Sequence, residues 1–193
     1  TFYEALVGSQ ATLISLVPTQ MFDLLSFELR APKKLRAALI GGAALSETVY
    51  DRAQKLGWKL LPSYGMTETC SMIACSDGET QEPKILSHAK VRLDEGGQLQ
   101  VSASSLLSAY VHRHETSFEL VDPKYQDSEG LNWFNTQDFA HVRGDHIEVL
   151  GRGVDFFKVG GEGVSLLRLE NLLAQVKLEM KPDYDLTLLV VPD

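Results

Sequence analysis

The chain has 193 residues, 44% of them hydrophobic, with a formal net charge of −8 and a pI near 5.1. A chain of this length can bury a substantial core, whereas its acidity argues against a nucleic-acid-binding protein, which needs clustered Lys and Arg. No apolar run reaches the roughly 20 residues of a membrane-spanning helix, and the two cysteines, Cys70 and Cys75, are too few for a disulfide framework or a zinc site. We therefore expect a cytoplasmic protein with reduced thiols, no membrane span and no nucleic-acid partner.

The first 75 residues are predicted to alternate helices and strands. Apolar spacing and turn signals predict helix 2–9, strand 12–17, helix 18–26, strand 35–40, helix 46–56 and strand 58–62. Pro18 suits the first position of a helix, and Ser46 suits a helix N-cap. Because a strand, a helix and a second strand in succession make the two strands parallel, their carboxyl ends meet at one edge of the sheet, where ligands of open α/β sheets bind.

Residues 76–150 are predicted to be mainly β structure. Residues 76–88 collect Asp, Gly, Glu, Pro and Ser and are predicted to form a loop. Two hairpin patterns follow, one with strands 91–93 and 99–101 and one with strands 133–142 and 146–150. The expected fold class is α/β, with parallel α/β layers followed by a small β-barrel-like subdomain and then the start of a small α+β C-terminal domain.

The chain beyond residue 150 is punctuated by five glycines, Gly151, Gly153, Gly160, Gly161 and Gly163. A glycine-dense passage between two differently built regions predicts a hinge. A helix capped by Ser165 is predicted next, with apolar residues at helical spacing, and then a strand over 186–191. We therefore expect 1–150 to be the later part of a large domain, and 151–193 to be the hinge and the incomplete beginning of a C-terminal domain.

The segment from Tyr64 to Glu68 carries side chains that suit a bound nucleotide. An aromatic ring such as Tyr64 can stack on a purine, and Gly65 lets backbone N–H groups approach a phosphate. After Met66, the hydroxyl of Thr67 can bond phosphate oxygen, and the carboxylate of Glu68 can hold the Mg²⁺ that accompanies ATP. The alternative is a strand-to-turn junction with a buried Tyr and a capping Thr.

A second motif, Gly41-Gly42-Ala43, follows the strand predicted over 35–40. The strand predicted over 58–62 leads into Tyr64, so both motifs stand at the carboxyl ends of neighbouring parallel strands. We therefore expect the two motifs to face one pocket. A dehydrogenase is not favoured, because the Gly-x-Gly-x-x-Gly spacing is absent.

Five motifs, taken in order, resemble those of the adenylate-forming enzymes, a superfamily of acyl-CoA synthetases, luciferases and peptide-synthetase adenylation domains. They are Gly41-Gly42-Ala43, Tyr64-Gly65-Met66-Thr67-Glu68, Asp138, Gly151-Arg152 and Gly160-Gly161-Glu162-Gly163. Two stretches, 16–20 and 160–164, are similar to the o-succinylbenzoate–CoA ligases within that superfamily. The resemblance extends over essentially all of the chain.

The resemblance implies a role for each matched residue around a bound nucleotide. Tyr64 would stack on adenine, and Gly41, Gly42 and Ala43 would form the floor beneath the adenine and the acyl group. Gly65, Met66 and Thr67 would contact the nucleotide, with the Thr67 hydroxyl on phosphate, and Glu68 would bind Mg²⁺.

Three further roles come from the later motifs. Asp138 would accept both ribose hydroxyls, which suits an ionised carboxylate. Arg152 would bond the ribose or the α-phosphate side, which suits a planar guanidinium. The glycine loop 160–163 would let the backbone approach the pantetheine chain of coenzyme A.

Several positions depart from the family pattern. Where these enzymes usually carry Thr-Gly-Asp-x-Gly, the chain has Thr136-Gln137-Asp138-Phe139-Ala140, which keeps only the Thr and the Asp. Val154 stands where many members carry Asp at the hinge, and Asp155 matches the next position. Leu166 and Arg168 replace the usual Pro and acidic residue before the helix.

The resemblance implies an ATP-dependent acid–CoA ligase, specifically for o-succinylbenzoate in menaquinone synthesis, that works through an acyl-adenylate. Its partners would be a small-molecule carboxylic acid, ATP with Mg²⁺, and coenzyme A as co-substrate. The family's phosphate loop and C-terminal lysine have no counterpart here, so we expect a fragment with little or no ligase activity by itself. Two alternatives stay open: another acyl- or aryl-CoA ligase of the superfamily, and a non-catalytic module that binds a nucleotide or a partner.

Overall fold

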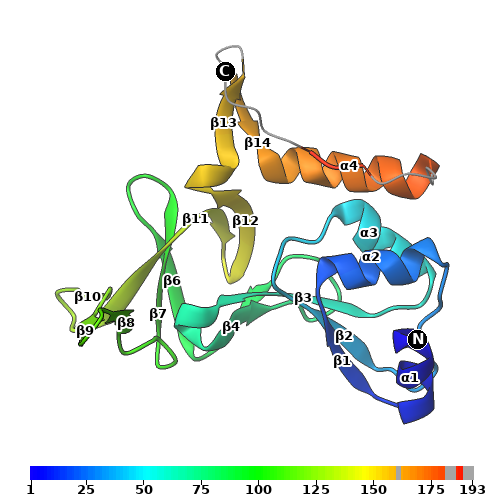
Figure 1. The fold of residues 1–193 in the computed structure, drawn as a ribbon, viewed down its shortest axis with the longest axis horizontal. Coiled ribbons are helices and arrows are strands. Elements are labelled where there is room, and N and C mark those ends of the chain that lie inside the picture. The colour runs from blue at the N-terminus through cyan, green and yellow to red at the C-terminus, as the bar shows by residue number, and fades with distance from the viewer. Residues whose placement is uncertain (160–161, 181–185, 189–193) are drawn as a thin grey trace. The chain divides into compact units, whose positions relative to one another are not determined.

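The computed structural model describes residues 1–159, 162–180 and 186–188 and divides the chain into two compact units. The first unit comprises residues 1–62, 76–81 and 154–193, and the second comprises residues 63–75 and 82–153. The fold is mixed α/β, with parallel strands and helices in the first unit and antiparallel strands in the second (Figure 1). The domain boundary expected after residue 150 stays a prediction.

The first unit alternates helices and strands. Up to residue 62 its elements are α1 (Phe2–Ser9), β1 (Leu13–Leu16), α2 (Pro18–Ser26), β2 (Ala37–Ile40), α3 (Glu47–Lys55) and the first part of β3 (Leu60–Met66). These elements confirm the predicted order. The strands pair in parallel, with Leu13 of β1 opposite Ala37 of β2 and Ala38 of β2 opposite Leu60 of β3.

The helices of the first unit begin where the sequence predicts. Ser46 Oγ accepts the Val49 N–H at 3.3 Å, which confirms Ser46 as the N-cap of α3. Thr1 Oγ1 accepts the Glu4 N–H at 3.3 Å at the start of α1. Pro18 occupies the first turn of α2, where the absence of its N–H removes no helical hydrogen bond.

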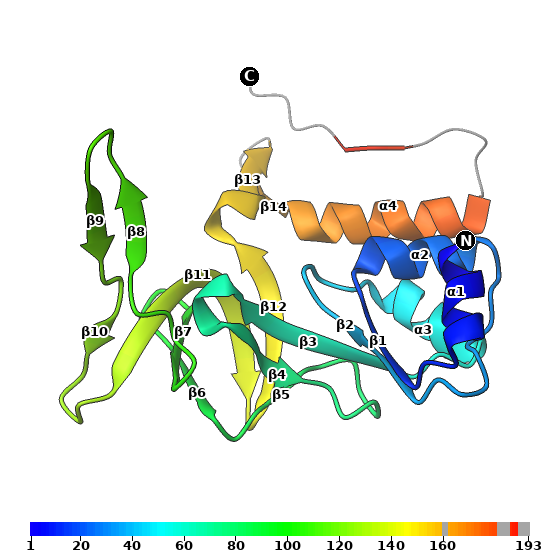
Figure 2. The same cartoon turned by 60° about the horizontal axis from the view of Figure 1, so that its bottom comes forward.

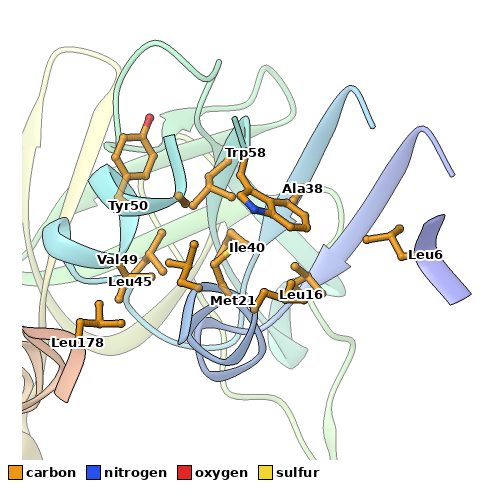
Figure 3. Close-up of a cluster of buried hydrophobic side chains, with 14 residues drawn as sticks. Leu6, Leu16, Met21, Ala38, Ile40, Leu45, Val49, Tyr50, Trp58 and Leu178 are labelled. Carbon is orange, nitrogen blue, oxygen red and sulfur yellow. The ribbon is translucent and has the colours of Figure 1, made fainter. Parts of the chain in front are cut away.

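A cluster of buried apolar side chains from strands and helices forms the core of the first unit (Figure 3). Trp58 is 1% exposed, and its indole N–H donates to the Leu29 carbonyl at 2.8 Å, so a large ring is buried without an unpaired polar atom. Leu178 of α4 (Leu166–Met180) joins this cluster. This core therefore anchors β2, which leads into the 41–43 motif, and the first part of β3, which leads into the 64–68 motif.

The second unit is built from antiparallel strands. After the end of β3 come β4 (Ser71–Cys75), β5 (Lys84–Ile85), β6 (Ala89–Leu93), β7 (Gln98–Ala103), β8 (Tyr110–Arg113), β9 (Phe118–Val121), β10 (Tyr125–Gln126), β11 (Asn132–Arg143) and β12 (His146–Arg152). The hydrogen-bonded order is β3-β4-β5-β12-β11-β7-β6, and β10 pairs with β11. The two predicted hairpins, β6 with β7 and β11 with β12, are confirmed. Ile73, Leu99, Val101 and Ile147 are fully buried at the centre of this unit. Closure into a barrel stays a prediction.

Several strands in the second unit differ from the sequence prediction. β3 continues to Met66 instead of ending at residue 62, because β4 provides an antiparallel partner for its second part. β5 lies inside the segment 76–88, which was predicted to be a loop. β8 and β9 form a two-stranded sheet that the sequence did not predict (Figure 2).

The chain after β12 contains a short 3-10 turn, η2 (Gly153–Asp155), and a hairpin of β13 (Phe156–Val159) and β14 (Glu162–Ser165). Ser165 Oγ accepts the Arg168 N–H at 3.4 Å, which confirms Ser165 as the cap of α4. Gly160 and Gly161 of the predicted pantetheine loop lie outside the described residues. Of the strand predicted over 186–191, residues 186–188 have no regular secondary structure and the rest lies outside the described residues. The described helices include none that is both long and apolar enough to cross a membrane.

Candidate functional site

The end of β3 brings Tyr64 and Gly65 against the backbone of β4. Tyr64 lies opposite Ala74 and Gly65 lies opposite Met72, with an irregularity in the pairing between Tyr64 and Gly65. A Cβ atom on Gly65 would lie 2.2 Å from the Ser71 carbonyl oxygen and 2.5 Å from Met72 Cα. The two backbones therefore approach too closely for any side chain, and only glycine fits here.

A 3-10 turn, η1 (Thr67–Thr69), follows β3 and orients the polar end of the motif. Thr69 Oγ1 accepts the Met66 N–H at 3.1 Å and donates to the Ser71 carbonyl at 2.7 Å. Thr69 is only 1% exposed, so its hydroxyl ties the residues on both sides of the turn together from inside. The first residue of the turn is exposed and the second, Glu68, is half-buried, which leaves both available to a ligand.

Three of the predicted site residues meet at Asp138. The Tyr64 hydroxyl donates to Asp138 Oδ2 at 2.6 Å, and Arg152 Nε donates to Asp138 Oδ1 at 2.7 Å. Arg152 lies directly opposite Asp138 in the β11–β12 pairing, which explains the second contact. The Asp138 side chain is 6% exposed and the Arg152 side chain is 56% exposed. A buried carboxylate is thus held by one neutral and one cationic donor.

The protonation states in this cluster follow from burial and hydrogen bonding. Burial, and then the hydrogen bond and charge of Asp138, raise the pKa of Tyr64. The hydrogen bond to Asp138 raises the pKa of Arg152. Tyr64 therefore remains a hydroxyl donor and Arg152 a cation throughout the physiological pH range. Each Asp138 oxygen keeps a further lone pair that can accept from a ligand hydroxyl.

Glu68 is held by a second set of contacts. Its Oε1 accepts from the Tyr110 hydroxyl at 2.9 Å, and its backbone carbonyl accepts the Leu107 N–H at 2.7 Å. Burial, together with the hydrogen bond and charge of Glu68, raises the pKa of Tyr110, so Tyr110 is the donor. The other oxygen, Oε2, makes no hydrogen bond with the described part of the chain. One face of this carboxylate is fixed and the other can receive a ligand.

Residues 1–101 match the sequence model of a family described as AMP-binding enzyme. The chain belongs to this family. A 2-succinylbenzoate–CoA ligase of Bacillus pumilus is 27% identical over an alignment 190 residues long, which covers 88% of this chain and 37% of the relative. The chain therefore spans about a third of the length of the curated relatives it matches.

Solved structures of similar proteins agree with this membership of the AMP-binding enzymes. A single-substitution variant of Escherichia coli MenE with bound OSB-AMS is 28% identical with a TM-score of 0.68, covering 85% of this chain and 35% of that one. Bacillus subtilis o-succinylbenzoate CoA synthetase (MenE) in complex with ATP and magnesium ion is 24% identical with a TM-score of 0.66, covering 85% of this chain and 36% of that one. The second similarity concerns the fold.

The residues around Glu68 fit a magnesium ion that arrives with a nucleotide. Among the described residues no group of three or more His, Cys, Asp and Glu is arranged to hold a metal by itself. Mg²⁺ is usually bound through one or two carboxylates together with the phosphates of its substrate. A single half-buried carboxylate with one unengaged oxygen matches that requirement, whereas a resident metal centre needs more ligands.

Gly41, Gly42 and Ala43 lie in the first unit, at the end of β2. Ile40, the last residue of β2, pairs with Pro62 of β3, and the Gly41 N–H donates to the Leu16 carbonyl at 3.1 Å. Gly42 adopts a φ of +87°, which glycine tolerates without strain. That this segment shares a pocket with Tyr64 stays a prediction.

The residues that sequence analysis missed are those that hold Glu68. Tyr110 and Leu107 lie about forty positions after it along the chain, and the hairpin of β8 with β9 was not predicted. Neither residue stands in a motif that marks nucleotide chemistry. Only the long-range fold of the second unit brings them to Glu68.

Gln137 stands where this family usually has glycine, and its backbone keeps a glycine-like conformation. It adopts a φ of +63°, a left-handed conformation that favours glycine, at the position where Thr-Gly-Asp is usual. The Asn135 side-chain oxygen accepts the Gln137 N–H at 3.0 Å, and Thr136 Oγ1 accepts the Asp138 N–H at 3.1 Å. These bonds hold the chain in the shape that presents Asp138, although the residue there is not glycine.

We expect Gln137→Gly to raise the free energy of unfolding by about 0.5–1 kcal/mol, because relief of the left-handed strain exceeds the added chain entropy of glycine. Urea unfolding measures the difference. Gln100→Gly, in strand β7 and without a positive φ, is the control and should lower the same free energy by about 0.5–1 kcal/mol. A Gln137→Gly protein less stable than its parent would contradict the strain assigned to this position.

Proposed function

We propose that this chain is part of an ATP-dependent acid–CoA ligase. The carboxylate oxygen of the acid attacks the α-phosphorus of ATP, the bond to pyrophosphate breaks, and an acyl-adenylate forms. The thiol of coenzyme A then attacks the acyl carbon, and AMP leaves with the bonding electrons as the thiol loses its proton. In such chemistry the protein mainly positions the reactants and offsets phosphate charge. It does not need to form covalent bonds itself.

The observation that carries this proposal is the convergence of Tyr64, Asp138 and Arg152, three residues matched to nucleotide contacts. The lone pairs left on Asp138 can accept the two ribose hydroxyls. The Tyr64 ring, fixed by its hydroxyl, offers a face to adenine. Because Arg152 is more than half exposed, part of its guanidinium can also reach a phosphate or ribose oxygen.

The triphosphate end of the nucleotide is assigned to η1. The exposed Thr67 hydroxyl can donate to a phosphate oxygen, and the backbone at Gly65 and Met66 can come close to the nucleotide. Glu68 would hold Mg²⁺ through its unengaged oxygen. When bound, the ion neutralises phosphate charge and so eases the departure of pyrophosphate. The Bacillus subtilis relative whose structure contains ATP and magnesium ion supports this assignment.

We further assign o-succinylbenzoate as the acid, which would place the enzyme in menaquinone synthesis in the cytoplasm. The support is the names of the relatives, 2-succinylbenzoate–CoA ligases that are 25% to 30% identical over 84% or more of this chain. Coenzyme A would be the co-substrate.

Carboxylate-dependent exchange of labelled pyrophosphate into ATP tests this function. The assay uses the complete encoded protein that contains this chain, with o-succinylbenzoate, a fatty acid and an aryl acid in parallel. We expect exchange with o-succinylbenzoate and thioester formation when coenzyme A is added. If exchange occurs only with another acid, that acid and not o-succinylbenzoate is the substrate. If no acid supports exchange, the protein is a non-catalytic nucleotide-binding module.

A further inference from the structure

We propose that Tyr110 and Lys124 are positioning residues that hold Glu68 in place for its cation. This inference rests on the proposed function, because it assigns these two side chains a task in the same nucleotide site. Neither residue belongs to a matched motif. Both act from the segment 107–124, which encloses the hairpin of β8 and β9.

Tyr110 acts directly on the carboxylate. Its hydroxyl donates to Glu68 Oε1 at 2.9 Å, and both side chains are partly buried. A glutamate on a short turn would otherwise sample several rotamers, and fixing it costs side-chain entropy each time a ligand binds. With Oε1 held by Tyr110, the unengaged Oε2 is presented in one direction. Hydrogen bonds of this kind to a carboxylate ligand orient it for a metal.

A backbone contact fixes the turn itself. The Leu107 N–H donates to the Glu68 carbonyl at 2.7 Å, so the same segment that supplies Tyr110 also holds the main chain of η1. Two hydrogen bonds from positions 107 and 110 thus determine where Glu68 lies and how its side chain points. Their effect depends on the segment 107–110 keeping its shape.

Lys124 fixes the shape of that segment. Its ammonium group donates to the Leu107 and Ser108 carbonyls, each at 2.7 Å, and lies 2.7 Å from Asp122 Oδ1. An ammonium has three N–H bonds, so these three oxygens satisfy it completely. The Lys124 side chain is 11% exposed, although lysine usually extends into solvent. A largely covered lysine whose three N–H bonds are all used therefore holds two consecutive main-chain carbonyls, those of Leu107 and Ser108.

These contacts form one path from Lys124 to the cation ligand. Lys124 holds the carbonyls at 107 and 108, the peptide N–H at 107 holds the Glu68 main chain, and Tyr110 holds its side chain. All of these residues lie in the second unit. Loss of the Lys124 ammonium or of the Tyr110 hydroxyl should therefore loosen Glu68, while the Tyr64–Asp138 contact stays intact.

Calorimetric titration of ATP into the complete encoded protein, once with Mg²⁺ and once with EDTA, separates the cation-dependent part of the affinity. Mg²⁺ should increase the ATP affinity of the parent protein. We expect this increase to be roughly tenfold smaller in Tyr110→Phe and in Lys124→Met, the usual effect of losing a group that orients a metal ligand. The affinity measured in EDTA should be unchanged. Because both changes act on one carboxylate, the double variant should lose less than the product of the two.

Matched controls lie in the same unit. Tyr125→Phe removes a hydroxyl that contacts Arg92 at 3.0 Å instead of Glu68, and Lys90→Met removes an exposed ammonium. Both should leave the Mg²⁺-dependent gain as it is in the parent. A second readout is amide hydrogen exchange without nucleotide. Lys124→Met should speed exchange of the Leu107 N–H by roughly tenfold, because the segment that carries this donor loosens.

The outcomes separate the two proposals. If the parent protein binds ATP better with Mg²⁺ but Tyr110→Phe and Lys124→Met keep the full gain, the positioning role is overturned and the proposed ligase stands. If both variants weaken ATP equally in Mg²⁺ and in EDTA, their role is structural and the inference is again overturned. If the parent itself gains nothing from Mg²⁺, the proposed function falls and the inference falls with it.

Discussion

Gly65→Ala is expected to lower the free energy of unfolding by more than about 3 kcal/mol, a loss in the range of severe overpacking. The added Cβ would lie 2.2 Å from the Ser71 carbonyl oxygen, and both nearest groups are backbone atoms that cannot rotate away. The strands β3 and β4 would have to separate at the point where Tyr64 and η1 are set. Nucleotide binding should therefore be lost along with stability.

Urea unfolding of the complete encoded protein, followed by fluorescence, gives the free energy for this comparison. Gly8→Ala is the control, because nothing lies within 4 Å of a Cβ on Gly8 and the residue stands in helix α1. That change should stabilise the protein by roughly 0.5 kcal/mol, since alanine favours the helix. A Gly65→Ala protein within about 1 kcal/mol of its parent would show that the approach of the two strands is not as tight as described.

Glu68→Gln is expected to reduce carboxylate-dependent pyrophosphate exchange by roughly 100- to 1000-fold, equivalent to about 3–4 kcal/mol of barrier. Glutamine keeps the size of the side chain and an oxygen that can accept from the Tyr110 hydroxyl. What it removes is the negative charge that the proposed cation requires. The fold should therefore survive while the dependence on Mg²⁺ changes.

The measurement is the exchange rate as a function of Mg²⁺ concentration. The control is Glu119→Gln, since the Glu119 side chain is 61% exposed and pairs with His114, away from the turn. This control should exchange at the rate of the parent. If Glu68→Gln responded to Mg²⁺ as the parent does, Glu68 would not be the cation ligand, even if another residue of the site proved essential.

The elements of the first unit were predictable because their signals are local. Pro18 and Ser46 mark helix starts, and the apolar spacing of each element needs no knowledge of its partners. β3 was predicted too short because its second part depends on β4, which lies beyond the turn. The β8–β9 hairpin was missed because it buries little: Val111, Phe118 and Leu120 are 63% to 72% exposed. Without a buried face, nothing requires the sequence of these strands to alternate apolar and polar residues.

The candidate site was predictable only where a family pattern marks it. Tyr64 and Asp138 are 74 positions apart, and nothing in their spacing brings them within 2.6 Å; the resemblance alone suggested that both face a nucleotide. Gln137 lacked the expected glycine, yet the backbone keeps the glycine-like conformation. Tyr110 and Lys124 carry no pattern at all, because their contacts arise from tertiary packing.

Because Leu60 and Tyr64 both lie in strand β3, the number of residues between them is fixed. Side chains alternate along a strand, so one extra or missing residue in this interval would exchange which of them point inward. Leu60 would leave the hydrophobic interior, or Tyr64 would turn its hydroxyl away from Asp138. Between these two positions the strand register therefore decides whether the Tyr64 hydroxyl can reach Asp138.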